Sequence, residues 1–165
     1  MKPLKPLLLT ASHLLTLGLG FALGVYALPI LIAPDAPTEQ EIKASVPVAQ
    51  WTATFRRDLK DSDALHWGEG TVSISPQAIS LVGKLAPGPD YKLYLTPHFV
   101  DTEEAFLAIK DASARVGDVK TFNGFIVEVP ADIDVRDYST VVIWCEAFAQ
   151  FISSAEYQPP RQARK

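Results

Sequence analysis

The sequence is poor in sulfur. Its 165 residues include one cysteine, Cys145, and one methionine, Met1. A single cysteine excludes an internal disulfide and any Cys-x-x-Cys metal or redox motif. A blue-copper centre takes two histidines, a cysteine and usually a methionine, and Met1 is too far from Cys145 in the sequence to serve. These scarcities argue against copper.

Common catalytic motifs are also missing. The sequence has no Gly-x-Ser-x-Gly, no His-Glu-x-x-His and no phosphate-binding glycine loop. Asp132, Asp134 and Asp137 form an acidic group, but the central glycine and terminal glutamate of an EF-hand are absent, so no metal site is predicted. We assign no enzymatic reaction, and a non-catalytic accessory role is favoured.

Charge is absent from one long stretch, residues 7–33. Residues 7–28 are predominantly apolar and as a helix would extend roughly 33 Å, enough to cross a bilayer core of about 30 Å. The run is longer than the apolar part of a usual secretory signal. We therefore predict an uncleaved anchor, residues 1–33, that contacts the lipid bilayer through residues 7–28. A cleaved signal is the alternative, with Val25-Tyr26-Ala27 as its candidate site.

The flanking charges orient this predicted span. Lys2 and Lys5 precede it, whereas Asp35, Glu39 and Glu41 follow it. The positive-inside rule places the N-terminus in the cytoplasm. The chain is thus predicted to cross the inner or plasma membrane once, with its C-terminal part in the periplasm or extracellular space.

Small side chains recur on one face of the predicted helix. Ser12, Thr16, Gly20 and Gly24 are spaced four residues apart, and Gly20 and Gly24 form the Gly-x-x-x-Gly pattern that lets two membrane helices approach closely. A homodimer through Gly20 and Gly24 is compatible with this pattern. Because glycine is common in such helices, the pattern alone does not require one.

The part beyond the span is strongly acidic. Residues 34–160 carry 10 basic and 19 acidic side chains. Such a surface repels phosphate backbones, which excludes nucleic acid as a partner, whereas a basic or redox protein partner remains compatible with it. The length allows one domain with a sizeable core.

Turn residues divide the outward part into short segments rich in β-branched and aromatic side chains. We predict a proline-rich linker over 34–47, a domain over 48–157 and a basic disordered tail over 158–165. The strands are expected at 48–55, 70–75, 78–85, 91–96, 116–122, 125–129, 140–148 and 151–157. Asp101, with Glu104 three residues later, predicts the N-terminus of one short helix. The fold class is therefore an all-β antiparallel sandwich or barrel with one short helix, preceded by a single transmembrane helix.

Cys145 is the main candidate for chemistry. An outward-facing compartment is oxidising, so a lone cysteine there is buried, paired between chains, or in use. Alternation along its strand places Val141, Ile143 and Cys145 on one face, and Val142 and Trp144 on the other. A small buried core residue is the competing interpretation. His66 and His98 are the histidines of the outward part that join Cys145 as candidate cofactor ligands, although sequence cannot place their atoms together.

Several motifs of the outward part occur together in a known family. They are Trp51, Phe55, Gly88-Pro89-Asp90 before Leu93-Tyr94-Leu95, Gly117-Asp118-Val119-Lys120, Val129-Pro130, Asp134, Tyr138, Val141-Val142-Ile143-Trp144-Cys145, Phe148, Phe151 and Ala155. With these motifs the chain resembles the DM-thirteen (electron transfer DM) domain family, in the bacterial form with one membrane span and one domain.

The resemblance implies a β-sandwich and a role in electron transfer. It also implies that Cys145 acts as a redox thiol or holds a prosthetic group such as haem. Two functions follow as hypotheses. One is a membrane-anchored redox domain centred on Cys145, and the other is a non-catalytic sandwich that binds a protein or ligand and keeps Cys145 as a core residue.

Overall fold

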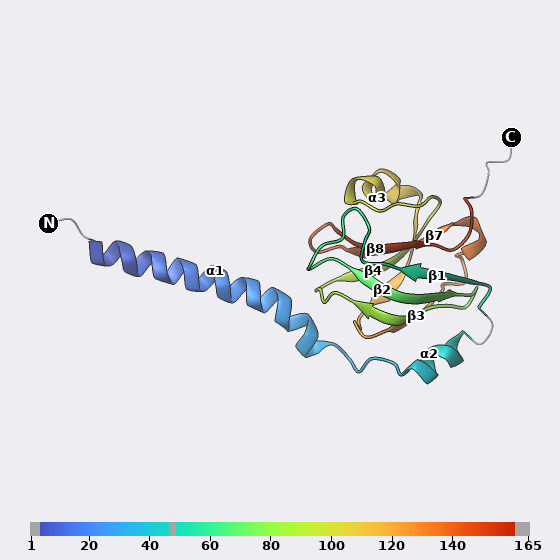
Figure 1. Ribbon diagram of the computed structural model, residues 1–165, viewed down its shortest axis with the longest axis horizontal. Helices are drawn as coiled ribbons and strands as arrows, with labels where there is room; N and C mark the ends of the chain where they lie inside the picture. Colours follow the sequence, from blue (N-terminus) through green and yellow to red (C-terminus); the bar gives the residue numbers. More distant parts are fainter. Residues whose placement is uncertain (1–3, 47–48, 161–165) are drawn as a thin grey trace.

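Two four-stranded antiparallel sheets face each other behind a long N-terminal helix in a computed structural model (Figure 1). The structure describes residues 4–46 and 49–160. In chain order the elements are α1 (Leu4–Ile32), α2 (Glu39–Ser45), β1 (Trp51–Phe55), β2 (Gly68–Ile74), β3 (Ala78–Leu85), β4 (Tyr91–Thr96), α3 (Glu103–Ile109), β5 (Ala114–Val119), β6 (Phe125–Glu128), β7 (Thr140–Cys145) and β8 (Gln150–Glu156), with 3₁₀ turns at Lys110–Ala112 and Val135–Asp137. The predicted all-β sandwich is confirmed.

The predicted strand segments match the observed strands closely. β3 and β4 have the predicted bounds, and the other six differ from the prediction by one to three residues at one or both ends. The predicted start at Val48 and the tail from residue 161 lie outside the described residues. Short β-branched segments between turn residues were enough to locate the strands, because such side chains fit a pleated, half-buried surface.

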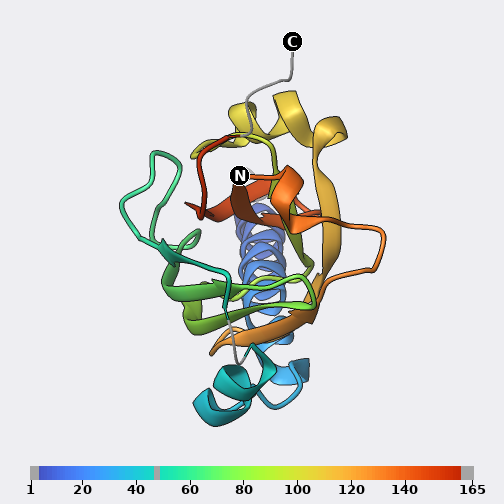
Figure 2. The same ribbon diagram turned by 90° about the vertical axis from the view of Figure 1, so that its right-hand side faces the viewer.

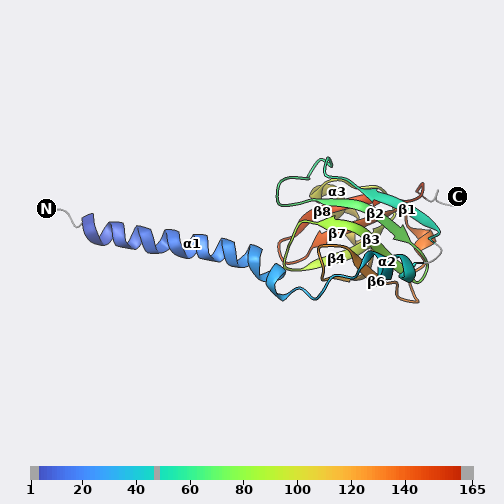
Figure 3. The same cartoon turned by 60° about the horizontal axis from the view of Figure 1, so that its bottom comes forward.

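The strand order is β1-β2-β3-β6 in one sheet and β5-β4-β7-β8 in the other. Every neighbouring pair is antiparallel. Figure 2 and Figure 3 show the two sheets as stacked layers. β1 lies against β8 at one pair of edges, where the rings of Trp51 and Tyr157 are 5.8 Å apart, and β5 lies against β6 at the other. The main core lies between the sheets.

Both faces of β7 are buried, and each faces a different group of side chains. Val141, Ile143 and Cys145 point into the core between the sheets, whereas Val142 and Trp144 join a second apolar cluster on the outer face. The second cluster is closed by Phe106 of α3, which packs on Trp144 with 4.7 Å between ring centroids. The predicted alternation is therefore confirmed, and α3 explains why the outward side of the strand is also apolar.

The cap of α3 differs from the prediction. The N-cap is Thr102, whose hydroxyl accepts a hydrogen bond from Ala105 N at 3.1 Å, one position after the predicted Asp101. Asp101 instead forms an ion pair with Lys60, with 3.2 Å between Lys60 Nζ and Asp101 Oδ1. The predicted capping box with Glu104 is therefore wrong, because the helix starts one residue later and Ala105 occupies the position where Glu104 was expected.

The segment predicted as a proline-rich linker contains a helix. α2 begins with a capping box in which Thr38 N donates to Glu41 Oε2 at 2.7 Å and Thr38 Oγ1 accepts from Glu41 N at 3.3 Å. Ile42 of this helix is buried against the sheet formed by β3 and β6. Pro34 and Pro37 precede the helix, so they limit where it starts without preventing it.

α1 extends away from one end of the sandwich (Figure 1, Figure 3). It is the one described helix long and apolar enough to cross a membrane by length and composition, and near the N-terminus such a helix is a signal sequence or a single-pass anchor. Its leucines are largely exposed, and the helix continues through Pro29 to Ile32. Pro29 itself is buried.

Candidate functional site

Cys145 is the last residue of β7 and lies at the end of the sandwich nearest α1. Its backbone pairs with Tyr91 of β4 on one side and with Gln150 of β8 on the other. The β7–β8 pairing shifts register next to Cys145, between Ile143 and Trp144, which leaves Ile152 as an extra residue on β8. Such bulges redirect side chains and are frequent beside functional sites.

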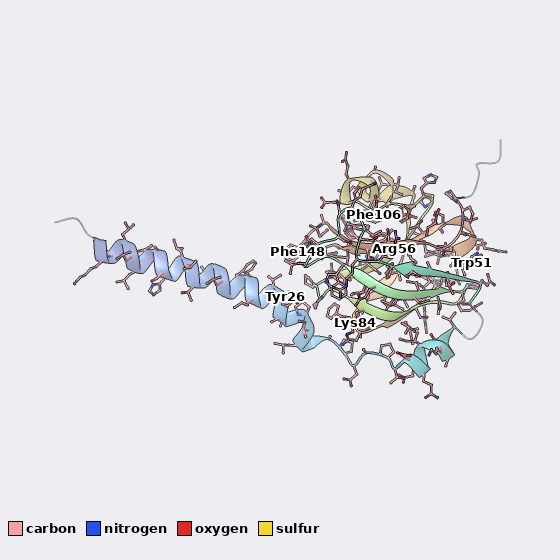
Figure 4. The ribbon with its side chains drawn as sticks, in the orientation of Figure 1. Tyr26, Trp51, Arg56, Lys84, Phe106 and Phe148 are labelled. Atoms are coloured by element: carbon pink, nitrogen blue, oxygen red, sulfur yellow. The ribbon has the colours of Figure 1, made fainter. Side chains whose placement is uncertain are left out.

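A cavity of about 320 Å³ lies beside Cys145. Its walls come from distant parts of the chain: α1, the loop before β2, the β3–β4 turn and the β7–β8 hairpin. Figure 4 shows Tyr26 of α1 and Phe148 of the hairpin turn near the junction of helix and domain. The lining is mostly apolar and consists of Phe21, Ala22, Val25, Tyr26, Leu65, His66, Pro87, Gly88, Pro89, Tyr91, Cys145, Phe148, Gln150 and Ile152.

Cys145 lines this cavity while the residue is only 2% exposed. Burial raises the pKa of the Cys145 thiol, because a low-dielectric surrounding disfavours the thiolate. The backbone N–H groups of Phe148, Asp90 and Ala147 act in the opposite direction, since they favour a charged sulfur. The thiol is therefore neutral at pH 7, and donors for its anion are already in place.

His66 lies at the same cavity and is held by Asp63. Asp63 Oδ2 is 2.9 Å from His66 Nδ1, and Asp63 Oδ1 accepts from the backbone N–H groups of Leu65 and His66 at 2.7 and 2.8 Å. The hydrogen bond from His66 lowers the pKa of Asp63, so this carboxylate is ionised and Nδ1 carries the shared proton. Nε2 is then the ring nitrogen left for a hydrogen bond to another group.

His98 is not brought together with Cys145 and His66. It follows Thr96 at the opposite end of β4 from Tyr91, where its carbonyl oxygen accepts a hydrogen bond from Thr96 Oγ1 at 2.7 Å. The copper ligand set of two histidines and one cysteine is therefore not assembled. Among residues 4–46 and 49–160 no group of three His, Cys, Asp or Glu side chains is placed to hold a metal ion.

A haem bound through Cys145 does not fit this site. Thiolate ligation needs a deprotonated sulfur that faces the macrocycle, whereas the Cys145 residue is nearly sealed and burial raises its pKa. The cavity volume is also at the lower end of the range of about 300–1,000 Å³ typical of small-molecule sites. The space suits a ligand with a single ring.

Tyr91 is a site residue that the sequence analysis did not single out. It is 3% exposed, lines the cavity, and is the backbone neighbour of Cys145. Burial raises the pKa of its hydroxyl, and Cys145 and Tyr26 add to that effect. A Cβ atom at Gly88 would be 2.4 Å from the Tyr91 hydroxyl oxygen, so only glycine lets the phenol lie here. The Gly88-Pro89-Asp90 motif was the available signal, because it directly precedes Tyr91.

Glu146, the next residue after Cys145, lies in a separate polar network on the outer face. It accepts hydrogen bonds from Tyr94, from Lys110 at 2.7 Å and from Trp144 at 3.3 Å. Burial acts to raise the pKa of Glu146, but the bonds from Lys110 and Tyr94 outweigh it, so the pKa is below its usual value. This network fixes the start of the β7–β8 turn. It also places the negative charge on the face of β7 opposite to the thiol.

Comparison with known proteins gives one family. The model of the family described as Electron transfer DM13 matches residues 55–157, which include the cavity residues contributed by the sandwich. No curated protein and no solved structure matches the chain.

Proposed function

The chain belongs to the electron transfer DM13 family, and from this membership we propose that it is a membrane-anchored electron-transfer accessory of the cell envelope with Cys145 as its redox thiol. The observation that carries the proposal is the position of Cys145 on the wall of a cavity shared by the domain and α1. A cysteine that served packing alone would not need backbone donors at its sulfur or an adjoining space.

α1 is proposed to be a retained anchor. Phe21, Ala22, Val25 and Tyr26 line the cavity, and Pro29 is buried, so the helix is part of the folded structure beside the site. Removal of the helix as a cleaved signal would expose the cavity to solvent. The large exposed leucines along the rest of α1 are the surface that a bilayer would cover.

Flanking charge supports an outward-facing domain. Lys5, in the first turn of α1, precedes the apolar run 7–28, and Asp35 and two glutamates follow the helix. The positive-inside rule then places the domain in the periplasm or outside the cell. In that compartment thiol–disulfide partners are the natural electron carriers, and the acidic domain surface favours a basic one.

The proposed redox step is exchange with a disulfide on a partner segment small enough to enter the cavity, because a residue that is 2% exposed is out of reach of a bulky one. The Cys145 thiolate attacks one partner sulfur, a new S–S bond forms, and the partner's own S–S bond breaks. The second partner sulfur leaves with the electron pair of that bond and takes up the proton lost by Cys145. Cys145 is oxidised and the leaving sulfur is reduced.

The alternative is a non-catalytic binding module in which Cys145 is structural. It is favoured by the 2% exposure of the residue and by the direction of its pKa shift, because both slow attack by the sulfur. The two functions differ in whether the thiol reacts in the folded protein.

Thiol modification of the full chain in lipid nanodiscs separates the two functions. Methyl methanethiosulfonate, a small reagent, should modify Cys145 without denaturant and faster as pH rises, whereas a maleimide on a polyethylene glycol chain should not. An exposed thiol in the same turn, in the variant Cys145→Ser with Ala147→Cys, supplies the reference rate. If Cys145 reacts only after unfolding, the redox proposal is wrong and the binding module is supported.

A further inference from the structure

The cavity beside Cys145 is positioned where a lipid-soluble molecule can reach it. Phe21, Ala22 and Val25 belong to the outer part of the apolar run 7–28, and they face the sandwich across the cavity. If α1 spans the bilayer, this wall lies at the outer boundary of the hydrocarbon core. A ligand dissolved in the membrane would therefore meet the cavity before any water-soluble ligand does.

The rim next to the helix is apolar as well. Leu65 and Phe148, each 56% exposed, stand at the tips of two loops that line the cavity. Exposed large apolar side chains beside a membrane helix are suited to the headgroup and acyl boundary. This arrangement keeps the entrance of the cavity in contact with lipid.

One polar group inside the cavity lacks a partner. The Tyr91 residue is 97% buried, and its hydroxyl makes no hydrogen bond to any other residue in the described part of the chain. Its phenol end lies over Gly88, which also lines the cavity. The hydroxyl oxygen is not among the fully buried, unpaired side-chain atoms of the described residues, so it is open to the cavity and can donate a hydrogen bond to a ligand oxygen.

We propose that the cavity binds the ring of a membrane-dissolved quinone, with the Tyr91 hydroxyl donating to one of its carbonyl oxygens. The inference rests on the proposed function, since an electron-transfer protein gives a redox-active ring a use. The size of the cavity fits one ring, and its apolar walls fit the flat faces. An acyl chain would fit the walls too, but it offers Tyr91 no acceptor.

The test is direct binding of decylubiquinone to the full chain in phosphatidylcholine nanodiscs. Quenching of protein fluorescence is titrated, and empty nanodiscs correct for partition into lipid. Saturable binding is expected. Tyr91→Phe should weaken it about tenfold, because one hydrogen bond is lost. Tyr138→Phe, at a tyrosine away from the cavity, should leave the affinity unchanged.

A variant that fills the cavity tests quinone binding without relying on the Tyr91 hydrogen bond. Ala22→Trp places a bulky side chain at the cavity from the exposed surface of α1 and should abolish saturable binding, whereas Leu14→Trp on the same helix should not. Binding that survives Ala22→Trp, or displacement by decane as effective as by a second quinone, would overturn the proposal.

The outcome can be separated from that of the redox proposal. Thiol modification and quinone binding are measured separately on the unchanged chain, so each of the two proposals can fail alone. If Cys145 proves unreactive while quinone binding is retained, the thiol mechanism fails and the binding site stands. If the thiol reacts but no quinone binds, the present inference fails alone.

Discussion

At the scale of single residues, Cys145 combines burial with an adjoining space. The sequence placed it on one strand face with Val141 and Ile143, and the structure shows that this face points into the core between the sheets. Burial raises the pKa of its thiol, although three backbone N–H groups act against this. The residue is therefore both a core side chain and one wall of a cavity.

The pH dependence of stability should report this burial. An acid whose pKa is higher in the folded state gives stability that is complete below the unfolded pKa, near 8.5 for cysteine, and that is lost as pH rises toward the folded pKa. Unfolding free energy should therefore fall between about pH 8.5 and 9.5, by at most about 1.4 kcal/mol per pH unit. Chemical unfolding followed by tryptophan fluorescence measures it.

Cys145→Ala is the matched control. It removes the titrating thiol, so the slope over this pH interval should flatten even though the variant has lower stability at neutral pH. The interval stops below pH 10, where exposed tyrosines ionise in the unfolded state. Equal slopes in the two proteins would show that the thiol is not ionised differently on folding.

Among the secondary-structure elements, the β7–β8 turn contains a strained residue. Ala149 has a φ of 50°, in the left-handed region that costs an L-residue about 1–2 kcal/mol. The turn carries Phe148 and leads from Cys145 to Gln150, so its conformation shapes one wall of the cavity. The strain lowers the stability of the fold, and such strain is typical of functional sites.

Ala149→Gly should stabilise the protein by about 1 kcal/mol, because glycine adopts this φ freely. For a domain of this size such a change raises Tm by a few degrees. Ala147→Gly, in the same turn but without a positive φ, should be neutral or destabilising. Equal effects of the two substitutions in thermal unfolding would contradict the role of φ.

In the whole molecule, the helix and the sandwich form one site. Residues of α1 from Phe21 to Tyr26 complete the cavity that the domain leaves open beside Cys145. We therefore expect the mature protein to retain α1. Its intact mass, measured from a membrane fraction after carbonate extraction, should correspond to a chain that still contains residues 7–33.

Loss of α1 would contradict this prediction. Cleavage after Ala27 would give a product that begins at Leu28 and is released from the membrane by carbonate. That outcome would support a signal sequence and would remove one wall of the proposed quinone site. Retention of α1 without the proposed orientation would be revealed by protease protection of the domain in sealed spheroplasts.

The sequence by itself determined the apolar helix, the eight strands and the strand face that Cys145 shares with Val141 and Ile143. Each depends on a local pattern: an uncharged run of sufficient length, β-branched segments between turns, and alternation along β7. It misplaced the cap of α3 by one residue and missed α2, because helix ends depend on single side-chain hydrogen bonds and on burial of residues such as Ile42.

Only the tertiary structure decided which residues surround the thiol. It placed His66, Tyr91 and α1 at the same cavity as Cys145. It placed His98 at the other end of β4, away from the cavity. The residues at the cavity are far apart in the chain, and their proximity follows from the pairing of β4 with β7 and from the position of the C-terminal part of α1 at one end of the sandwich. Local patterns cannot contain such contacts, since they arise when distant segments bury their apolar surfaces against one another.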